Sequence, residues 1–351
     1  MKGFLLTSAI TFFAFFLAKI PSIQTSTHLS PTVFAILIGI CLSAWFFKHQ
    51  SALEKGVNFS AKKLLRLGII LYGFNITFSE LMEIGLPGFL ASLIIIGIIF
   101  LAALLIGIKL LHLDRDTCML IGAGSGICGA AAILALESTL KNCPSKTIIA
   151  VSCIVIFGLL CMFLYPLAFY TGLIPLLDQN SMGFFMGATL HEVANVVGAS
   201  EIAKDMGGFP QQAANTAIIM KMIRVIMLVP FLLCLTYYLY KKEQPITDTN
   251  TASIQIPYFA FLFLAIILLH TFLSPYEETF FIGESSLHTF IDYAKFLSSL
   301  CIVSAMAALG LQINFKKLIK TSKKAFLLAF FLSILLIIGG YLLTLSYLTL
   351  D

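Results

Sequence analysis

Residues 88–108 read GFLASLIIIGIIFLAALLIGI, a run without a charged side chain that is long enough to cross a lipid bilayer as a helix. Its apolar residues are continuous and do not alternate with polar ones, which excludes a strand of a membrane β-barrel. Inside a bilayer only a helix satisfies the backbone hydrogen bonds of such a run within the segment itself. The stretch therefore predicts a membrane-spanning helix.

Similar segments recur along the whole chain of 351 residues. The chain is 59% hydrophobic and only 11% charged, whereas a soluble domain is about 25% charged. No connection is long enough to hold a soluble domain. We therefore predict an all-α, polytopic membrane protein with a single transmembrane domain over residues 1–351 and 11 transmembrane helices. The segments cover residues 3–20, 31–47, 61–82, 87–112, 116–140, 146–171, 181–203, 209–240, 257–273, 286–311 and 324–349.

The charged residues predict the orientation of these segments. Basic clusters follow the second, eighth and tenth segments, and an acidic group (Glu277, Glu278 and Glu284) follows the ninth. With the N-terminus in the cytoplasm and the C-terminus outside, all three basic clusters are cytoplasmic, as the positive-inside rule requires. The net charge of +5 is therefore a topology signal and does not indicate nucleic-acid binding. The eight cysteines contain no Cys-x-x-Cys pair, so they indicate neither a disulfide framework nor a metal site.

Two stretches of the sequence match each other. Residues 71–78, LYGFNITF, align with residues 308–315, ALGLQINF, and each stretch precedes a long apolar segment. Seven segments separate the copies, so they run in opposite directions. This pattern predicts an inverted repeat with elements near 61–112 and 298–349, as in many secondary transporters. Asn75 and Gln312 hold matched positions, where they either cap the helix ends or contact substrate.

A glycine-rich stretch interrupts the fifth segment. Residues 121–131 read IGAGSGICGAA, and each glycine weakens a helix by up to ~1 kcal/mol relative to alanine. We predict a helix that breaks near Ser125–Gly129 and a half-helix whose N-terminus attracts an anion. Close helix packing through small residues is the alternative. The GxGxxG pattern of residues 124–129 lacks the strand and acidic residue of a dinucleotide site. The candidate substrate-binding residues here are Ser125, Gly126, Cys128 and Gly129.

Ionisable residues also interrupt the seventh segment, at His191 and Glu192. An ionisable group within the bilayer costs several kcal/mol, so such residues are functional candidates, here for coupling to protons or another ion. A structural pair that faces a neighbouring polar group is the alternative. The sequence from His191 to Asn195 resembles HExxH, but Asn195 replaces the second histidine that a zinc protease needs. Asn195 is instead a candidate substrate ligand.

The eighth segment carries two cations at helical spacing, Lys221 and Arg224. They lie too deep to be ordinary end-of-helix charges unless they extend to the interface. Together with one acid, Glu192, they predict a positive site that favours an anionic substrate. In the alternative, one cation pairs with Glu192 and the other reaches the cytoplasmic interface. Asn215 and, with less weight, Gln212 are further candidates on the same segment.

These motifs together resemble the bacterial sulfate exporter family typified by the YeiH membrane proteins. The resemblance implies a bacterial inner-membrane location and a fold similar to bile-acid/sodium symporters and sodium/proton antiporters, with inverted repeats and two discontinuous helices that cross at the midplane. It is carried by Ser125-Gly-Ile-Cys-Gly129 with the following alanines, Gly187 to Val197, Lys221-x-x-Arg224 and Ala307-Ala-Leu-Gly310.

The direction of the two interrupted segments conflicts with this fold. In a count of eleven spans, segments 116–140 and 181–203 run parallel, whereas crossing broken helices of an inverted repeat run antiparallel. Either the count is off by one, because one of these segments re-enters the membrane, or the second break lies elsewhere, near Ala305–Gly310.

The predicted function is secondary active transport, as an exporter of a small anion such as sulfate or an organosulfonate, with alternating access coupled to protons. A sodium-coupled symporter of an organic anion is the second hypothesis, and an intramembrane hydrolase is a remote third. We expect no enzymatic activity, no cofactor and no metal. The expected partners are the small anion and the lipid bilayer, without nucleic acid; whether the protein forms a homodimer is left open.

Overall fold

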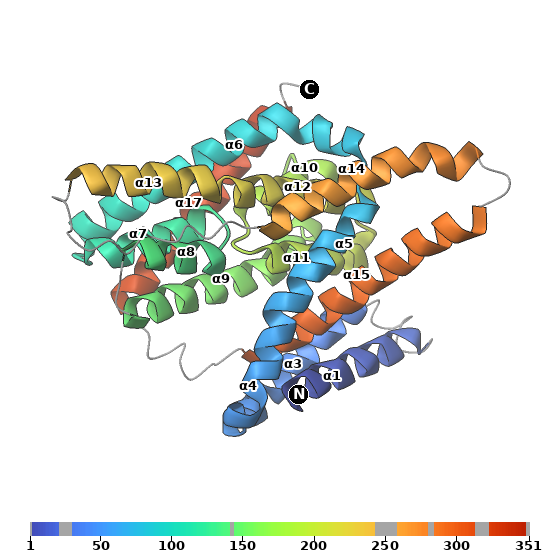
Figure 1. The fold of residues 1–351 in the computed structure, drawn as a ribbon. Coiled ribbons are helices and arrows are strands. Elements are labelled where there is room, and N and C mark those ends of the chain that lie inside the picture. Colours follow the sequence, from blue (N-terminus) through green and yellow to red (C-terminus); the bar gives the residue numbers. More distant parts are fainter. Residues whose placement is uncertain are drawn as a thin grey trace. The chain divides into compact units, whose positions relative to one another are not determined.

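The computed structural model of the chain describes residues 2–20, 30–140, 144–242, 258–279, 284–312 and 323–348. Every regular element within these ranges is a helix (Figure 1). The helices form two compact units: unit 1 contains residues 1–83, 197–215 and 258–315, and unit 2 contains residues 84–196, 216–257 and 316–351. Each unit draws on stretches from the whole length of the chain. The single domain expected over residues 1–351 stays a prediction.

Unit 1 is built around the contact between α3 and α15, which lie side by side in Figure 1. Gly39 and Gly310 allow this approach, because a Cβ on Gly39 would lie only 2.9 Å from the Cα of Gly310. Apolar side chains of α1, α3, α4 and α15 complete the core. The helices that lie wholly in unit 1 are α1 (Lys2–Lys19), α3 (Pro31–Lys48), α4 (Gln50–Phe59), η1 (Ser60–Leu64), α5 (Leu65–Tyr72), η2 (Gly73–Asn75), α14 (Tyr258–Thr279) and α15 (Glu284–Gln312).

Unit 2 combines the short helices α7, α8 and α10 with longer ones. Helix α7 packs against α9 and α17, and α10 also packs against α17. The helices are α6 (Phe78–Leu104) with η3 (Leu105–Leu110), α7 (Arg115–Gly126), α8 (Ala130–Leu140), α9 (Pro144–Tyr170), α10 (Gln179–Thr189), α13 (Leu228–Lys242) and α17 (Lys323–Leu348). Two more helices, α11 (Val193–Gly207) and α12 (Gln211–Ile226), belong partly to each unit, and residues 78–83 of α6 belong to unit 1.

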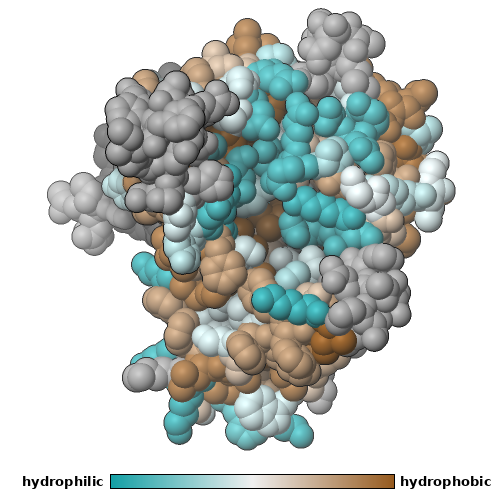
Figure 2. Space-filling model, turned by 90° about the vertical axis from the view of Figure 1, so that its right-hand side faces the viewer, coloured by the Kyte–Doolittle hydropathy of each residue, from teal (hydrophilic) through white to brown (hydrophobic). Residues whose placement is uncertain are grey.

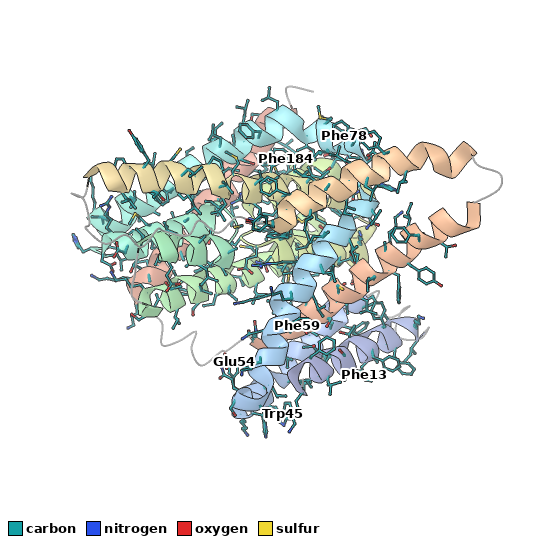
Figure 3. All side chains as sticks on the ribbon, in the orientation of Figure 1. Phe13, Trp45, Glu54, Phe59, Phe78 and Phe184 are labelled. Carbon is teal, nitrogen blue, oxygen red and sulfur yellow. The ribbon has the colours of Figure 1, made fainter. Side chains whose placement is uncertain are left out.

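The lengths and surfaces of the helices confirm an all-α membrane protein. Seven helices of the described ranges are long and apolar enough to cross a bilayer. Large apolar side chains face outward: Phe13, Trp45 and Phe59 are 45–50% exposed, whereas Phe184 is 1% exposed (Figure 3). Brown, hydrophobic residues form broad areas of the surface in Figure 2. The count of eleven spans and the inverted repeat stay predictions, and residues 313–315 of the repeat lie outside the described ranges.

Both interrupted segments are broken, the first of them at the predicted position near Ser125–Gly129. Helix α7 ends at Gly126 and α8 begins at Ala130, and α10 ends at Thr189 before α11 begins at Val193. The alternative position for the second break, near Ala305–Gly310, is wrong, because α15 continues as one helix through those residues. The four short helices have 12, 11, 11 and 15 residues, too few to cross a hydrocarbon core of about 30 Å singly.

An ion-pair cluster holds the start of α7 to α9. The side chain of Asp114 caps α7 by accepting a hydrogen bond from the Thr117 N–H, 3.0 Å away. Lys146 Nζ lies 2.7 Å from Asp114 Oδ2 and 3.0 Å from Asp116 Oδ2. Burial disfavours the charged carboxylate, but the hydrogen bonds from Lys146 and Thr117 outweigh it and lower the pKa of Asp114. The charge of Lys146 is thus matched locally.

Candidate functional site

The candidate site lies within unit 2. It consists of two helix interruptions, with the helix ends that flank them, and two cations of a third helix. We call it the paired-break site and define it as residues 125–130 and 187–195 with Lys221 and Arg224. It combines the ends of α7 and α10, the starts of α8 and α11, and the C-terminal half of α12.

A single glycine creates the first interruption. Gly129 has a φ of 70°, a left-handed conformation that side chains with a Cβ disfavour. Its N–H donates to the carbonyl oxygen of Gly124 at 3.0 Å, which closes the last turn of α7 before the chain turns into α8. Other glycines of the stretch serve packing: a Cβ on Gly122 would lie 2.6 Å from that of Ala103, and one on Gly124 would lie 2.7 Å from Ile133 Cδ1. The predicted break and the close packing of the alternative are therefore both present, at different glycines, and the attraction of an anion by the half-helix stays a prediction.

The second interruption uses extended backbone instead of a glycine. Leu190 follows α10 with φ −62° and ψ 145°, and two further residues, His191 and Glu192, precede α11. The first turn of α11 forms when the Val196 N–H donates to the Glu192 carbonyl oxygen at 3.2 Å. This geometry exposes the last carbonyl groups of α10, which no later turn of the helix satisfies.

Lys221 and Arg224 satisfy the carbonyl ends of both interrupted helices. Lys221 Nζ donates to the carbonyl oxygens of Ile127 and Leu190 at 2.8 and 2.7 Å. Arg224 donates to residues of the first interruption through Nε and Nη2 and to residues of the second through Nη1. Its acceptors are the carbonyl oxygens of Ser125 (3.1 Å), Gly126 (2.6 and 3.2 Å), Gly187 (3.4 Å), Ala188 (2.5 Å) and Leu190 (3.4 Å).

These contacts overturn one interpretation of the two cations. Lys221 and Arg224 are each 0% exposed, so neither extends to the interface. Within the described ranges, neither cation forms an ion pair with Glu192. Their role in the fold follows from helix electrostatics, because a helix C-terminus carries about half a negative elementary charge and attracts cations. The two side chains join the C-termini of α7 and α10.

Glu192 caps the restarting helix of the other interruption. Its Oε1 accepts a hydrogen bond from the Ala130 N–H at 3.0 Å, at the N-terminus of α8. A carboxylate is stabilised there by the free N–H groups and the positive end of the helix dipole. Gly129 makes room for it, because a Cβ at that position would overlap the Glu192 side chain. The second interruption therefore supplies the anion that stabilises the first.

Three buried polar atoms of the site have no hydrogen-bond partner: Ser125 Oγ, His191 Nδ1 and Asn195 Nδ2. Ser125 and His191 are 0% exposed and Asn195 is 3% exposed. The other ring nitrogen of His191 lies 3.5 Å from Ser333 Oγ on α17. Because buried polar groups are normally satisfied, three unpartnered atoms in one site indicate a place for a polar ligand or water.

The site is not equally accessible throughout. Glu192, Ala130 and Ala131 are partly exposed, whereas Lys221 and Arg224 are sealed from solvent. Cys128, in the first interruption, is buried at 6% exposure. A solute that approaches the site therefore meets the N-terminus of α8 and the Glu192 carboxylate before it meets either cation.

The remaining candidates make their described contacts in unit 1. Asn215 Nδ2 donates to the Asn75 carbonyl oxygen at 2.9 Å and to Glu80 Oε1 at 3.1 Å. Its Oδ1 accepts hydrogen bonds from Gln211 Nε2 at 2.9 Å and from Tyr72 Oη at 3.3 Å. We call Asn215, Asn75, Tyr72, Glu80 and Gln211 the Asn215 network.

The paired repeat positions do not make equivalent contacts. Asn75 Nδ2 caps its own helix end by donating to the Tyr72 carbonyl oxygen at 3.2 Å. Gln312 Nε2 instead donates to Asn58 Oδ1 at 2.7 Å. Gln212 is exposed. The capping alternative is thus confirmed for Asn75, and substrate contact stays a prediction for these three residues.

Sequence reasoning missed Gly158 of α9 and Ser333 of α17. A Cβ on Gly158 would overlap Asn195 Nδ2 and lie 3.4 Å from His191 Cβ, so this glycine makes room for the second interruption. Each is a single small residue inside an apolar run. That is the only feature of the sequence that distinguishes these two positions, and it does not indicate which residues they contact. Among the described residues, no three His, Cys, Asp or Glu side chains group closely enough to hold a metal ion.

Comparison with known proteins places the chain in a family. The family described as conserved hypothetical protein 698 matches residues 2–329. A UPF0324 membrane protein of Campylobacter jejuni is 57% identical over 346 residues, which are 99% of this chain and 94% of the relative. A UPF0324 membrane protein of Helicobacter hepaticus is 44% identical and covers 97% of this chain and 96% of its own.

A third relative is a YeiH protein, the type to which the sequence motifs point. The UPF0324 inner membrane protein YeiH of Escherichia coli is 36% identical over 344 residues, 97% of this chain and 92% of the relative. No solved structure matches the chain. The likeness to bile-acid/sodium symporters and the sulfate label therefore stay predictions. The chain is an integral membrane protein, and it belongs to the conserved hypothetical protein 698 family, with the UPF0324 membrane proteins such as YeiH as its relatives.

Proposed function

We propose that this protein is a secondary active transporter, an exporter of a small anion, and that the paired-break site binds the anion. The observation that carries the proposal is the meeting of two interrupted helices in one membrane protein, with two buried cations and three unpartnered polar atoms. Non-helical backbone within a membrane is tolerated where it is buried in protein or lines a cavity, and transporters use such backbone to bind substrate. The relatives named inner membrane proteins support an inner-membrane location.

The chemistry of the site favours an oxyanion such as sulfate or an organosulfonate. The N-terminus of α8 already binds carboxylate oxygen through the Ala130 N–H, and sulfate and sulfonate oxygens accept hydrogen bonds in the same way. Arg224 keeps its positive charge at physiological pH, and it favours an anion at the site although its donors are engaged by carbonyl groups. Ser125 and Asn195 supply further polar atoms.

Proton coupling is favoured over sodium coupling. Sodium would need the freed carbonyl oxygens of the interruptions, but those of Ser125, Gly126 and Ile127 accept hydrogen bonds from Arg224 and Lys221. His191 and Glu192 are titratable groups at the site, and either is suited to take up a proton during alternating access. Transport, without a catalytic step, is the activity proposed.

The test is flux through purified protein in liposomes. We expect saturable uptake of radiolabelled sulfate, inhibited by methanesulfonate and driven by a pH gradient, but unaffected by a sodium gradient. A matched pair of variants separates the site from surface charge: Glu192→Ala should abolish the response to the pH gradient, while Lys63→Gln, at an exposed lysine of η1, should transport as wild type. Fluxes of both anions that equal those of protein-free liposomes under either gradient would overturn the proposal.

A further inference from the structure

We infer that the carboxylate of Glu192 is a built-in occupant of the anion position, and that the transported oxyanion takes its place at the N-terminus of α8 when Glu192 accepts a proton. This inference rests on the proposed function and adds to it the binding position and the reason for proton coupling. The exchange is simple to balance: one proton neutralises the carboxylate, the hydrogen bond from the Ala130 N–H is released, and that N–H donates to the incoming anion.

The shape of the α8 N-terminus fits an exchangeable anion. Helix α8 has 11 residues and begins with three alanines, whose own side chains are single methyl groups. The Glu192 carboxylate reaches this helix end from a residue 62 positions along the chain. Because Gly129 has no side chain, the space beside the helix end is filled by Glu192 itself. Withdrawal of that side chain therefore vacates a position lined by N–H donors.

Accessibility identifies the same position. Glu192 and Ala130, which form this hydrogen bond, are partly exposed, as is the neighbouring Ala131, whereas Lys221 and Arg224 are 0% exposed. The donors of both cations already serve carbonyl oxygens of the two interruptions. An anion that competed for those donors would have to uncap two helices. An anion that competes with Glu192 displaces only one carboxylate hydrogen bond.

The charges of the site lead to the same conclusion. Each helix end carries about half an elementary charge, so the two C-termini of α7 and α10 offset the two N-termini of α8 and α11. The fixed positive charge of Arg224 then offsets the negative charge of Glu192. A second anion is therefore poorly stabilised while Glu192 is ionised, and well stabilised once Glu192 is neutral, with any charge on Lys221 adding to the attraction.

The groups around Glu192 come from three elements. Lys221 approaches from α12, with Arg224 three residues further along that helix, Cys128 lies in the first interruption, and His191 precedes Glu192 in the chain. The Ala130 N–H donates its hydrogen bond to the Glu192 carboxylate and to none of these neighbouring groups. Replacement of Glu192 alone should thus remove the competition, while the other titratable groups remain.

The experiment measures binding, without transport, by calorimetry on the purified full-length protein in detergent, with sulfate and methanesulfonate as probes at pH 5.5 and 8. We expect wild type to bind more tightly at pH 5.5, by up to about tenfold per pH unit for one coupled proton. Glu192→Gln should bind equally at both pH values, with the affinity of wild type at pH 5.5. Glu201→Gln, on α11 and paired with Lys204, is the matched control and should keep the wild-type pH dependence.

A second measurement needs no variant. Titration of wild type in two buffers with different ionisation enthalpies gives the number of protons taken up per anion, and we expect one at pH 8. An uptake of zero, or a Glu192→Gln protein that keeps the wild-type pH dependence, overturns the inference while anion binding itself upholds the proposed function. Failure of both anions to bind wild type at either pH overturns the proposed function and the inference with it.

Discussion

The paired-break site and the Asn215 network are both clusters of polar side chains within helical units, but they differ in how completely their atoms are partnered. Each polar atom of the Asn215 side chain has two partners: the amide nitrogen donates to Asn75 and Glu80, and the oxygen accepts from Gln211 and Tyr72. In the paired-break site, Ser125, His191 and Asn195 each keep one buried polar atom without a partner.

This difference separates a structural role from a binding role. A satisfied buried network stabilises and orients the helices that it joins. A buried donor or acceptor without a partner instead destabilises the fold by about 1–3 kcal/mol, and it is tolerated where a ligand or water completes it. The comparison therefore favours the paired-break site, over the Asn215 network, as the proposed place of anion binding.

The largest expected effect is that of Arg224→Ala. This variant tests whether the cations of the paired-break site hold the C-termini of α7 and α10 together. The substitution removes the donors that join the ends of α7 and α10 and leaves their carbonyl groups unpartnered in the interior. Loss of one partner from a buried charged contact costs about 3–5 kcal/mol. We expect the unfolding temperature in detergent to fall by many degrees, measured by the reaction of the buried cysteines with a maleimide dye.

Two further variants make this prediction specific. Arg224→Lys keeps the charge but has a single nitrogen in place of the planar guanidinium, so its unfolding temperature should lie between those of wild type and Arg224→Ala. Lys109→Ala removes an exposed cation of η3 and should unfold like wild type. If Arg224→Ala matched Lys109→Ala, the cations would not hold the two helix ends together.

A smaller effect is expected from Gly129→Ala, which tests the first interruption alone. The left-handed backbone of Gly129 costs about 1–2 kcal/mol for a residue with a Cβ, and the added methyl group would displace Glu192 from the start of α8. We expect a moderate loss of stability and loss of pH-driven sulfate flux in liposomes.

Gly126→Ala is the matched control for stability. Gly126 lies in α7, and a Cβ there would be 3.6 Å from the nearest atoms, an ordinary contact. Alanine is favoured over glycine in a helix by up to ~1 kcal/mol, so this protein should be as stable as wild type or more so. Equal loss in the two variants would show that general crowding, and not the conformation of residue 129, is responsible.

The sequence reveals the interrupted segments but not the contacts across them. Glycine content and ionisable residues are local properties: the first correctly predicts the break at 127–129, and the second marks the segment in which α10 ends and α11 begins, without predicting a break at 190–192. The partner of Glu192 is 62 residues away, and the acceptors of Arg224 are 34–99 residues away. Which backbone end a long side chain reaches is decided by packing of helices in space, and helical periodicity does not specify it.

The same reasoning explains why Asn215 was grouped with the cations. Asn215, Lys221 and Arg224 lie on one helix, α12, and all three are polar residues in an apolar segment. The sequence predicts that these polar groups are buried, but it does not predict which of them have hydrogen-bond partners. Satisfaction depends on Tyr72 and Glu80, which are distant in the chain.

The smallest effect on transport is expected from Asn215→Ala, which tests the other half of the comparison. The variant leaves Glu80 and the Asn75 carbonyl group without one of their donors, so stability should fall by about 1–3 kcal/mol. The network is complete without a ligand. The sulfate affinity of the folded protein should therefore stay within about twofold of wild type at each pH, a difference below ~0.5 kcal/mol in binding free energy. Asn215→Asp, which keeps the shape and replaces the two amide hydrogens with a charge next to Glu80, should destabilise the fold further without altering affinity.

A tenfold loss of sulfate affinity in Asn215→Ala, with an unfolding temperature close to that of wild type, would instead place Asn215 among the ligands of the anion. Complete hydrogen bonding would then no longer distinguish the two clusters.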